Sequence, residues 1–421
     1  MKLRLQGNLW HHKHFQRFWF GDSVSQVTAQ VTAVAMPFVA LRTLSATPIE
    51  MGELVAIQFL AFPILGLFVG VWADRYRKRP IMVLANVGRM FALGSIPLAS
   101  VLHTLSINQL FIVAAITGVC TVFFDVCYQS YLPVLIHRDD LLEGNSKLQL
   151  SASAAQPLGQ SIGGFLVDLV TAARAISVDV AGFLVSAVAL LSIRKPEPKP
   201  DPVIDRNFFR EMKEGAKVVL GSRILSSIAS CTATSNLGSQ IAYVALVIFA
   251  IQTLQMSGSA LGITYAVGSI GSLLGAWIAA PVSKRLGLGL TIVLSSAASI
   301  GLLISPLALY SPPILILSIS QFIVGALVVI FNINQVSLRQ AITSDDLQGR
   351  MNATMRTIVW GTIPVGSVLG GFLVASRGVV PTIIVGSVLS TLAFVWVLIS
   401  PVLELKEIPK QQGYDAEVRL G

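Results

Sequence analysis

Twelve apolar stretches follow one another along this chain, and each is long enough to cross a bilayer core, which takes about 20 helical residues. Charged residues make up only 12% of the 421 residues, whereas a soluble domain carries about 25%. We therefore expect an all-α membrane protein, and we exclude a soluble enzyme domain, a disordered chain and a disulfide-stapled secreted protein. The predicted spans are 18–41, 54–73, 80–101, 107–127, 148–169, 173–193, 223–253, 259–282, 288–310, 314–336, 351–374 and 379–402.

The basic residues are distributed unevenly between the predicted loops. The net charge is +9, from 30 Lys and Arg against 21 Asp and Glu. If the N-terminus is cytoplasmic, only Arg42, Arg174 and Arg377 fall in outside loops, and the cluster at 75–79 falls inside. The positive-inside rule then predicts a multi-pass protein of the cell (inner or plasma) membrane with both termini in the cytoplasm. The basic excess reflects topology, so we expect no nucleic-acid partner.

A proline-rich connection divides the chain near its middle. Four prolines between residues 196 and 202 forbid a continuous helix and favour an extended spacer. The following stretch, 206–220, alternates apolar and charged residues at helical spacing, which suits a helix at the cytoplasmic membrane surface. We predict an N-terminal six-helix half (1–193), a cytoplasmic linker with an amphipathic helix (194–222), a C-terminal six-helix half (223–402) and a cytoplasmic tail (403–421).

An internal repeat supports two related halves. The stretch from Gly163 to Val167 reads Gly-Gly-Phe-Leu-Val, and the same five residues recur from Gly370 to Val374 at an offset of 207. The loops ahead of these spans share an Asp-Asp-Leu at an offset of 206, and glycines at 66 and 70 match those at 271 and 275. Three separated matches at nearly one offset indicate a duplicated unit.

The turn after the second span carries a recognisable motif. It reads Gly70-Val-Trp-Ala-Asp74-Arg75-Tyr-Arg77-Lys78-Arg79 and resembles the signature loop of the major facilitator superfamily. The resemblance covers the whole chain, including a degenerate second copy at 275–285. It implies the major facilitator fold, with twelve transmembrane helices in two six-helix halves, and a transporter rather than an enzyme. A narrower resemblance, to the drug- and macrolide-efflux and siderophore-export branch, depends on Phe124-Asp125, Leu132-Pro133, Asp139-Asp140-Leu141 and Asn145.

This resemblance implies a charge relay that closes the cytoplasmic side. The acid at Asp74, the base at Lys78 and the fourth-helix acid Asp125 take the family positions, while Arg77 stands where the family usually has glycine. Which of Arg77 and Lys78 contacts Asp125 therefore stays open. The alternative is that the basic residues only set topology. We call the predicted relay the cytoplasmic latch, and it comprises Gly70, Asp74, Arg75, Arg77, Lys78 and Asp125.

Acidic residues within spans are costly, at roughly 2.5–3.5 kcal/mol at a helix centre, so each suggests a function. All of them lie in the N-terminal half. Asp22 lies about a turn and a half into the first span, and we predict that it couples transport to protons together with Asp125. The alternative is that Asp22 forms a fixed structural bridge with Arg89 or Arg356.

Neutral polar residues dominate the other spans that line the cavity of this architecture. A cavity rich in amides, aromatics and methionines suits a large amphipathic solute. Interhelical hydrogen bonding, worth about 0.6 kcal/mol each, is the alternative role. The predicted substrate-binding residues are Gln26, Gln30, Gln156, Gln160, Asn236, Gln240, Tyr243, Asn332, Gln335 and Trp360.

Together these patterns predict a secondary active transporter. Its most consistent activity is proton-coupled antiport that exports amphipathic drugs or siderophore-like compounds, as in multidrug resistance, by alternating access. Its partners would be a small amphipathic substrate, protons and membrane lipids, and we expect a monomer with no cofactor and no metal. The arginine that many proton-coupled exporters carry in the fourth span is absent, because Ala114 takes its place. The alternatives are an ion-coupled importer of a small nutrient, and a lipid-handling or sensory membrane protein that does not transport.

Overall fold

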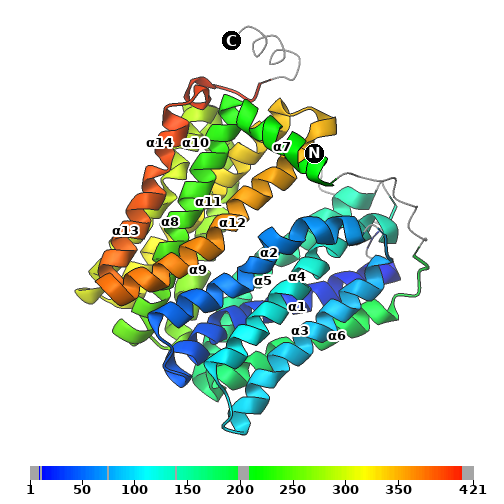
Figure 1. The fold of residues 1–421 in the computed structure, drawn as a ribbon, viewed down its shortest axis with the longest axis vertical. Helices are drawn as coiled ribbons and strands as arrows, with labels where there is room; N and C mark the ends of the chain where they lie inside the picture. The colour runs from blue at the N-terminus through cyan, green and yellow to red at the C-terminus, as the bar shows by residue number, and fades with distance from the viewer. Residues whose placement is uncertain (1–8, 10–11, 74, 138–139, 198–207, 410–421) are drawn as a thin grey trace. The chain divides into compact units, whose positions relative to one another are not determined.

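The computed structural model describes residues 9, 12–73, 75–137, 140–197 and 208–409. Within these ranges it leaves out the side chains of residues 67, 70–73, 208–212 and 345–346. Every regular element among the described residues is helical (Figure 1), which confirms the predicted all-α fold.

The helices of the N-terminal part follow one another with short connections. They are α1 (Lys13–Phe38), α2 (Pro48–Ala73), α3 (Lys78–Val101), α4 (Ile107–Leu135), α5 (Leu141–Val170) and α6 (Ala172–Ser192). The helix α1 continues into a π-helical turn at Val39–Thr43.

The C-terminal part begins with a short helix and contains two interrupted spans. Its elements are α7 (Phe208–Gly221), α8 (Arg223–Ile248) with a π-helical turn (Phe249–Thr253), α9 (Gly258–Leu286), α10 (Leu288–Ser296) with a 3₁₀ segment (Ala298–Leu309), α11 (Pro313–Ile342), α12 (Asp345–Arg377), α13 (Val379–Leu392), α14 (Phe394–Leu398) and a last 3₁₀ turn (Pro401–Glu404). The π-helical turns end α1 and α8 at equivalent places in the repeat, 210 residues apart.

Eleven segments of the described chain are long and apolar enough to cross a membrane. The helix α5 is not among them, although its 30 residues give a length of about 45 Å at 1.5 Å per residue. Its middle carries Gln156 and Gln160, so it is more polar than its neighbours. Length and hydropathy together describe a multi-pass membrane protein.

The chain forms two compact units. Unit 1 comprises Met1–Ala46, Ile57–Ile204 and Gln255–Ala266, and unit 2 comprises Thr47–Ala56, Asp205–Leu254 and Val267–Gly421. The start of α2 thus belongs to unit 2, and the start of α9 belongs to unit 1. Each unit contains most of one predicted half and a short exchanged segment of the other.

The two units repeat one packing plan. In unit 1, α1 packs against α5 and α6, and α3 packs against α4 and α6. In unit 2, α8 packs against α12 and α13, while the 3₁₀ segment after α10 packs against α11 and α13. The corresponding helices are those that the sequence repeat aligns, so the duplication seen in the sequence has its counterpart in the packing.

The short helix α7 docks on protein. Val219 is fully buried in a cluster with Met351 and Met355 of α12, and Glu214 forms an ion pair with Arg350 at 2.9 Å. The amphipathic pattern suggested a helix on the membrane surface. An apolar stripe does not distinguish lipid from a groove between helices, and here α12 covers part of it.

Candidate functional site

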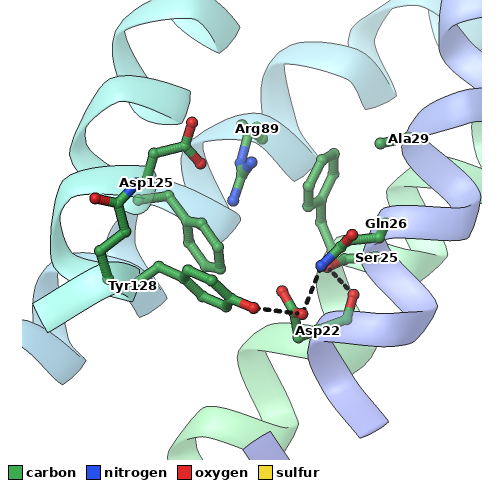
Figure 2. Close-up of a pocket in the computed structure, with 10 residues that line it drawn as sticks. Asp22, Ser25, Gln26, Ala29, Arg89, Asp125 and Tyr128 are labelled. Atoms are coloured by element: carbon green, nitrogen blue, oxygen red, sulfur yellow. Dashed lines mark hydrogen bonds between the residues drawn. The ribbon is translucent and has the colours of Figure 1, made fainter. Parts of the chain in front are cut away.

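A cavity of about 340 Å³ lies within unit 1. Four helices supply its walls, and Figure 2 shows several of their polar side chains converging on it. We call it the unit 1 cavity. Its lining residues are Asp22, Ser25, Gln26 and Ala29 of α1, Arg89 of α3, Phe124, Asp125, Tyr128 and Gln129 of α4, and Phe183 of α6.

Asp22 is buried beside this cavity, with a side chain 4% exposed. Its Oδ2 accepts hydrogen bonds from the Gln26 amide at 2.6 Å and from the Tyr128 hydroxyl at 3.0 Å (Figure 2). Gln26 lies one helical turn after Asp22, whereas Tyr128 comes from α4. Two neutral donors thus stabilise the carboxylate, and both bonds end on the same oxygen.

Arg89 is a buried cation on the wall formed by α3 and is 8% exposed. Its guanidinium carbon lies 4.4 Å from the ring centroid of Phe124 and 4.3 Å from that of Phe183. The guanidinium donates to the side-chain oxygen of Asn86, and Asn86 donates to Ser186 at 2.9 Å. Two rings and one amide therefore fix this side chain, while its Nε has no hydrogen-bond partner among the described residues.

The bridge between Asp22 and Arg89, which was one form of the alternative role for Asp22, is not formed among the described residues. Both side chains line the same cavity, but the ion pairs found among the described residues are Lys147–Glu143 and Arg350–Glu214. Asp22 and Arg89 each have neutral partners of their own.

An aromatic column stands behind the charges. Phe124 stacks with Tyr128 at 5.9 Å between centroids, and Tyr128 contacts Phe18 at 5.4 Å. Arg89 lies over the rings of both Phe124 and Phe183, so that the aromatic column and Arg89 together connect residues of α1, α3, α4 and α6. Such packing holds the Tyr128 hydroxyl in place for Asp22.

The cytoplasmic latch lies only partly within the described residues. Asp74 lies outside them, and the structure gives the backbone of Gly70 but not its surroundings. Arg75 and Arg77 are exposed, and Asp125 lines the unit 1 cavity. The acid–base relay therefore stays a prediction.

Glu197 occupies a place that the sequence did not reveal. Its two carboxylate oxygens accept the backbone N–H groups of Lys78 at 2.6 Å and Arg79 at 3.1 Å, at the start of α3. A carboxylate at a helix N-terminus is favoured by the helix dipole and by the unpaired N–H groups there. The first residues of the linker thus return to the N-terminal end of α3, next to the signature loop.

The predicted substrate-binding residues divide between the two units. In unit 1, Gln26 lines the cavity, Gln160 donates to Gln30 at 3.4 Å, and Gln156 is exposed on α5.

In unit 2, Asn236 donates to the backbone of Val359 at 3.2 Å, and Gln335 donates to Asn332 at 3.4 Å. Trp360 lies 5.1 Å from the Arg356 guanidinium. Gln240 packs against Gly366, and Tyr243 is half-buried. Several of these groups therefore make interhelical or local contacts, as the alternative role requires.

Sequence reasoning missed Tyr128, Phe183 and Glu197. Tyr128 could have been found, because it follows Phe124 by four residues and Asp125 by three, which places all three near one face of α4. Phe183 and Glu197 carry no such local signal. Their roles depend on which helix end or side chain packs against them.

Solved structures share this arrangement of helices. A mutant of the nucleoside transporter NupG matches with a TM-score of 0.71 at 14% identity, over 91% of this chain and 98% of that chain. A bacterial homologue of the iron transporter ferroportin matches with a TM-score of 0.70 at 14% identity, over 93% and 100%. The chain has the fold of a major facilitator superfamily transporter, and at this identity the likeness concerns the fold alone.

The family follows from the sequence model for transmembrane secretion effectors, which matches residues 9–418. The chain belongs to this family of the superfamily.

Curated relatives include enterobactin exporter EntS of Salmonella choleraesuis (strain SC-B67), 22% identical over 94% of this chain and 93% of that protein. Another is macrolide efflux protein A of Streptococcus pyogenes, 26% identical over 50% of this chain and 52% of that protein. The match thus spans about half the length of the macrolide efflux protein.

Proposed function

We propose that this transporter is a proton-coupled antiporter that exports amphipathic drugs or siderophore-like compounds from the cytoplasm by alternating access. The names of the relatives, a macrolide efflux protein and an enterobactin exporter, support the direction and the substrate class. The observation that carries the proposal is the Asp22 carboxylate, which is buried in a spanning helix, lines a cavity and has no cationic partner among the described residues.

Asp22 has the properties that proton coupling requires. A carboxylate at this depth is expensive to keep ionised, but the Tyr128 hydroxyl and the Gln26 amide stabilise the charged form. Proton uptake from outside neutralises the Asp22 carboxylate. Proton release to the cytoplasm restores its negative charge. Coupling requires that the free-energy difference between the protonated and the ionised carboxyl changes between the outward-open and the inward-open carrier.

The driving force is sufficient for export. One charge that moves down about 100 mV supplies roughly 2.3 kcal/mol, and each 1.4 kcal/mol corresponds to about tenfold in concentration. A one-proton exchange of a neutral substrate thus sustains a gradient of about fifty-fold.

The other predicted roles complete this proposal. Asp125 serves as a second proton-coupling group and as the acid of the cytoplasmic latch. Among the predicted substrate-binding residues, Gln26 holds the cargo at the unit 1 cavity, whereas Asn236, Asn332 and Gln335 of unit 2 take the alternative role of bonding to their neighbours. We place the protein in the cell membrane with both termini in the cytoplasm.

Proteoliposomes that hold a pH-sensitive dye test the coupling. Addition of a macrolide, a siderophore or a cationic dye to the wild-type protein should change the internal pH, and Asp22→Asn should reduce this response by about tenfold or more because the amide cannot titrate. The matched control is Asp140→Asn, which makes the same change at the N-terminal end of α5. Substrate-driven proton movement that persists in Asp22→Asn would refute the assignment.

Everted vesicles test the direction. An exporter should accumulate substrate when the vesicle interior is acidified, whereas a proton-coupled importer should lose preloaded substrate under the same gradient. A protein that does not transport should do neither.

A further inference from the structure

Three charged side chains line the unit 1 cavity, Asp22, Asp125 and Arg89, and the opposite charges of Asp22 and Arg89 do not meet. Asp22 and Arg89 both face it, and the ion pairs found among the described residues do not include either of them. Buried opposite charges usually pair, because an uncompensated charge in a low-dielectric interior is costly. Here Asp22 and Arg89 line a cavity of about 340 Å³ instead of forming an ion pair.

The groups that hydrogen-bond to Asp22 and Arg89 or stack on Arg89 are uncharged. The bonds from Gln26 and Tyr128 position Asp22, and Figure 2 shows its carboxylate and Arg89 converging on one space from different helices. Asn86 and two phenylalanine rings position Arg89. The separation of the charges is therefore built into the packing of α1, α3, α4 and α6.

The N–H donors of Arg89 lie along the edge of its planar guanidinium. The ring centroids of Phe124 and Phe183 lie 4.4 and 4.3 Å from the guanidinium carbon, and one terminal nitrogen donates to Asn86. The Nε has no partner among the described residues, although the side chain is more than nine-tenths buried. The remaining in-plane N–H groups form the planar fork that matches a carboxylate.

Asp22 offers the complementary group. Both of its hydrogen bonds end on Oδ2, which leaves Oδ1 for a donor from a ligand. An ammonium group provides such a donor together with the opposite charge. Asp125 adds a second negative charge to the same lining, so an anion alone is disfavoured, while a cation alone leaves the edge of Arg89 unsatisfied.

We propose that the unit 1 cavity binds a zwitterionic head group, with its ammonium against Asp22 and its carboxylate against the edge of Arg89. This inference rests on the proposed function, because it names the chemistry of the exported substrate. It also explains why proton and substrate would move in opposite directions. A proton on Asp22 removes the negative charge that holds the ammonium, so that proton and substrate compete for one site.

A matched pair of dyes tests this recognition. Rhodamine 110 carries a cationic ring system and a carboxylate, and rhodamine 123 is its methyl ester, which lacks the negative charge. Fluorescence anisotropy with the purified full chain in nanodiscs should give tighter binding of rhodamine 110. Arg89→Gln should weaken rhodamine 110 by about tenfold or more, as expected for the loss of charge-assisted bonds, and leave rhodamine 123 nearly unchanged. Asp22→Asn should weaken both dyes.

Two further variants keep the test decisive. Arg89→Lys retains the charge but loses the planar fork, so it should fall between wild type and Arg89→Gln in its preference for rhodamine 110, and it decides the matter if Arg89→Gln does not fold. Arg339→Gln makes the same change in α11 of unit 2, where Arg339 contacts Asn352 at 3.5 Å, and it should leave the preference as in wild type.

The outcomes separate this inference from the proposed function. Equal binding of both dyes by the wild type, or an equal loss of both in the Arg89 variants, would overturn the zwitterion site. If proton exchange through Asp22 persists in that case, the antiporter stands without it. Selective dye binding without substrate-driven proton movement would instead refute the antiporter and leave the binding site.

Discussion

Unit 1 and unit 2 share a packing plan but differ in what they bury. Unit 1 encloses Asp22, Arg89 and Asp179. The interior of unit 2 is instead bridged by hydroxyls, with Ser390 in contact with Ser235 at 3.1 Å and with Ser299 at 2.7 Å. Apolar packing has thus been kept in both copies, while the charged side chains that are buried among the described residues lie in unit 1. The scaffold and the charged site can therefore vary independently.

The segments that the two predicted halves exchange make the same kind of close helix contact in both units. In unit 1, α5 meets the start of α9 through Gly164 and Gly258; in unit 2, α12 meets the start of α2 through Gly371 and Gly52. A Cβ atom on Gly164 or on Gly371 would collide with backbone of the facing helix. Small residues allow this close approach in both places.

Only the helix contact in unit 1 includes a charged side chain that bonds from one helix to the other. Asp168 of α5 accepts the backbone N–H groups of Gly258 and Ser259 at 2.7 Å each, so α9 begins with a cap from another helix. At the equivalent position in unit 2 the sequence has Ala375. There α2 is capped locally, because Glu50 accepts from the backbone of Thr47 at 2.7 Å.

The largest effect should come from filling the glycine contacts. Gly164→Leu and Gly371→Leu should each lower stability by about 1–3 kcal/mol or more, because the added side chain meets backbone that cannot yield. Thermal unfolding of the purified protein measures this loss. Gly66→Leu is the control, since a Cβ at Gly66 has open space around it. If one contact tolerated leucine and the other did not, the two packing surfaces would not be equivalent.

The next effect concerns the charged cavity alone. Tyr128→Phe keeps the ring in the aromatic column but deletes the hydroxyl that donates to Asp22. A hydrogen bond to a charged group is worth about 1.5–3 kcal/mol, so the ionised carboxylate loses support, and the pH midpoint of proton-coupled transport should move upward by about one unit or more. Tyr131→Phe removes a hydroxyl from the same helix and should leave the midpoint in place. An unchanged midpoint in Tyr128→Phe would separate Tyr128 from proton coupling.

A smaller difference is expected between the two helix caps. Asp168→Ala removes a carboxylate that binds two backbone N–H groups of another helix, and caps of this kind are worth about 0.5–2 kcal/mol. Glu50→Ala removes a cap within its own turn and should cost less. Unfolding midpoints of the two variants, measured side by side, give the comparison. Equal losses would mean that the charge on α5 adds nothing to the contact.

The smallest effect should come from the neutral polar groups of unit 2. Asn236→Ala deletes the bond to the backbone of Val359, and such interhelical bonds average about 0.6 kcal/mol. The apparent KM for substrate should therefore change by about threefold or less. A tenfold change in KM would make Asn236 a direct substrate contact and would weaken the idea that recognition is centred on unit 1.

The membrane helices and the repeat were predictable because their signals are local. Hydropathy is summed along one segment at a time, so 223–253 was recognised as a span from its own residues and forms α8 with its π-helical turn. The glycines at 163–164 and 370–371 were visible as a repeat for the same reason. The amphipathic stretch around 206–220 also showed its helical period, although it did not reveal that α12 covers Val219.

The polar contacts of the site were less predictable. Asp22 was identified because an acid in an apolar segment is rare, but its partner Tyr128 lies 106 residues away on α4. The sequence allowed a bridge between Asp22 and Arg89, and the structure packs Arg89 against two phenylalanine rings instead. Small rotations of a helix decide such choices, and hydropathy is insensitive to them.

The sequence by itself determined that this chain crosses the membrane repeatedly, that its framework is duplicated and that the acidic residues within its spans are few and lie in the N-terminal half. These properties follow from residue composition along each segment, which the lipid environment selects. Only the tertiary structure decided that Asp22 and Arg89 face one cavity as separate charges and that Glu197 returns to the start of α3. Those outcomes depend on the packing of helices distant in sequence, because a polar group takes the partner that packing brings within hydrogen-bond distance.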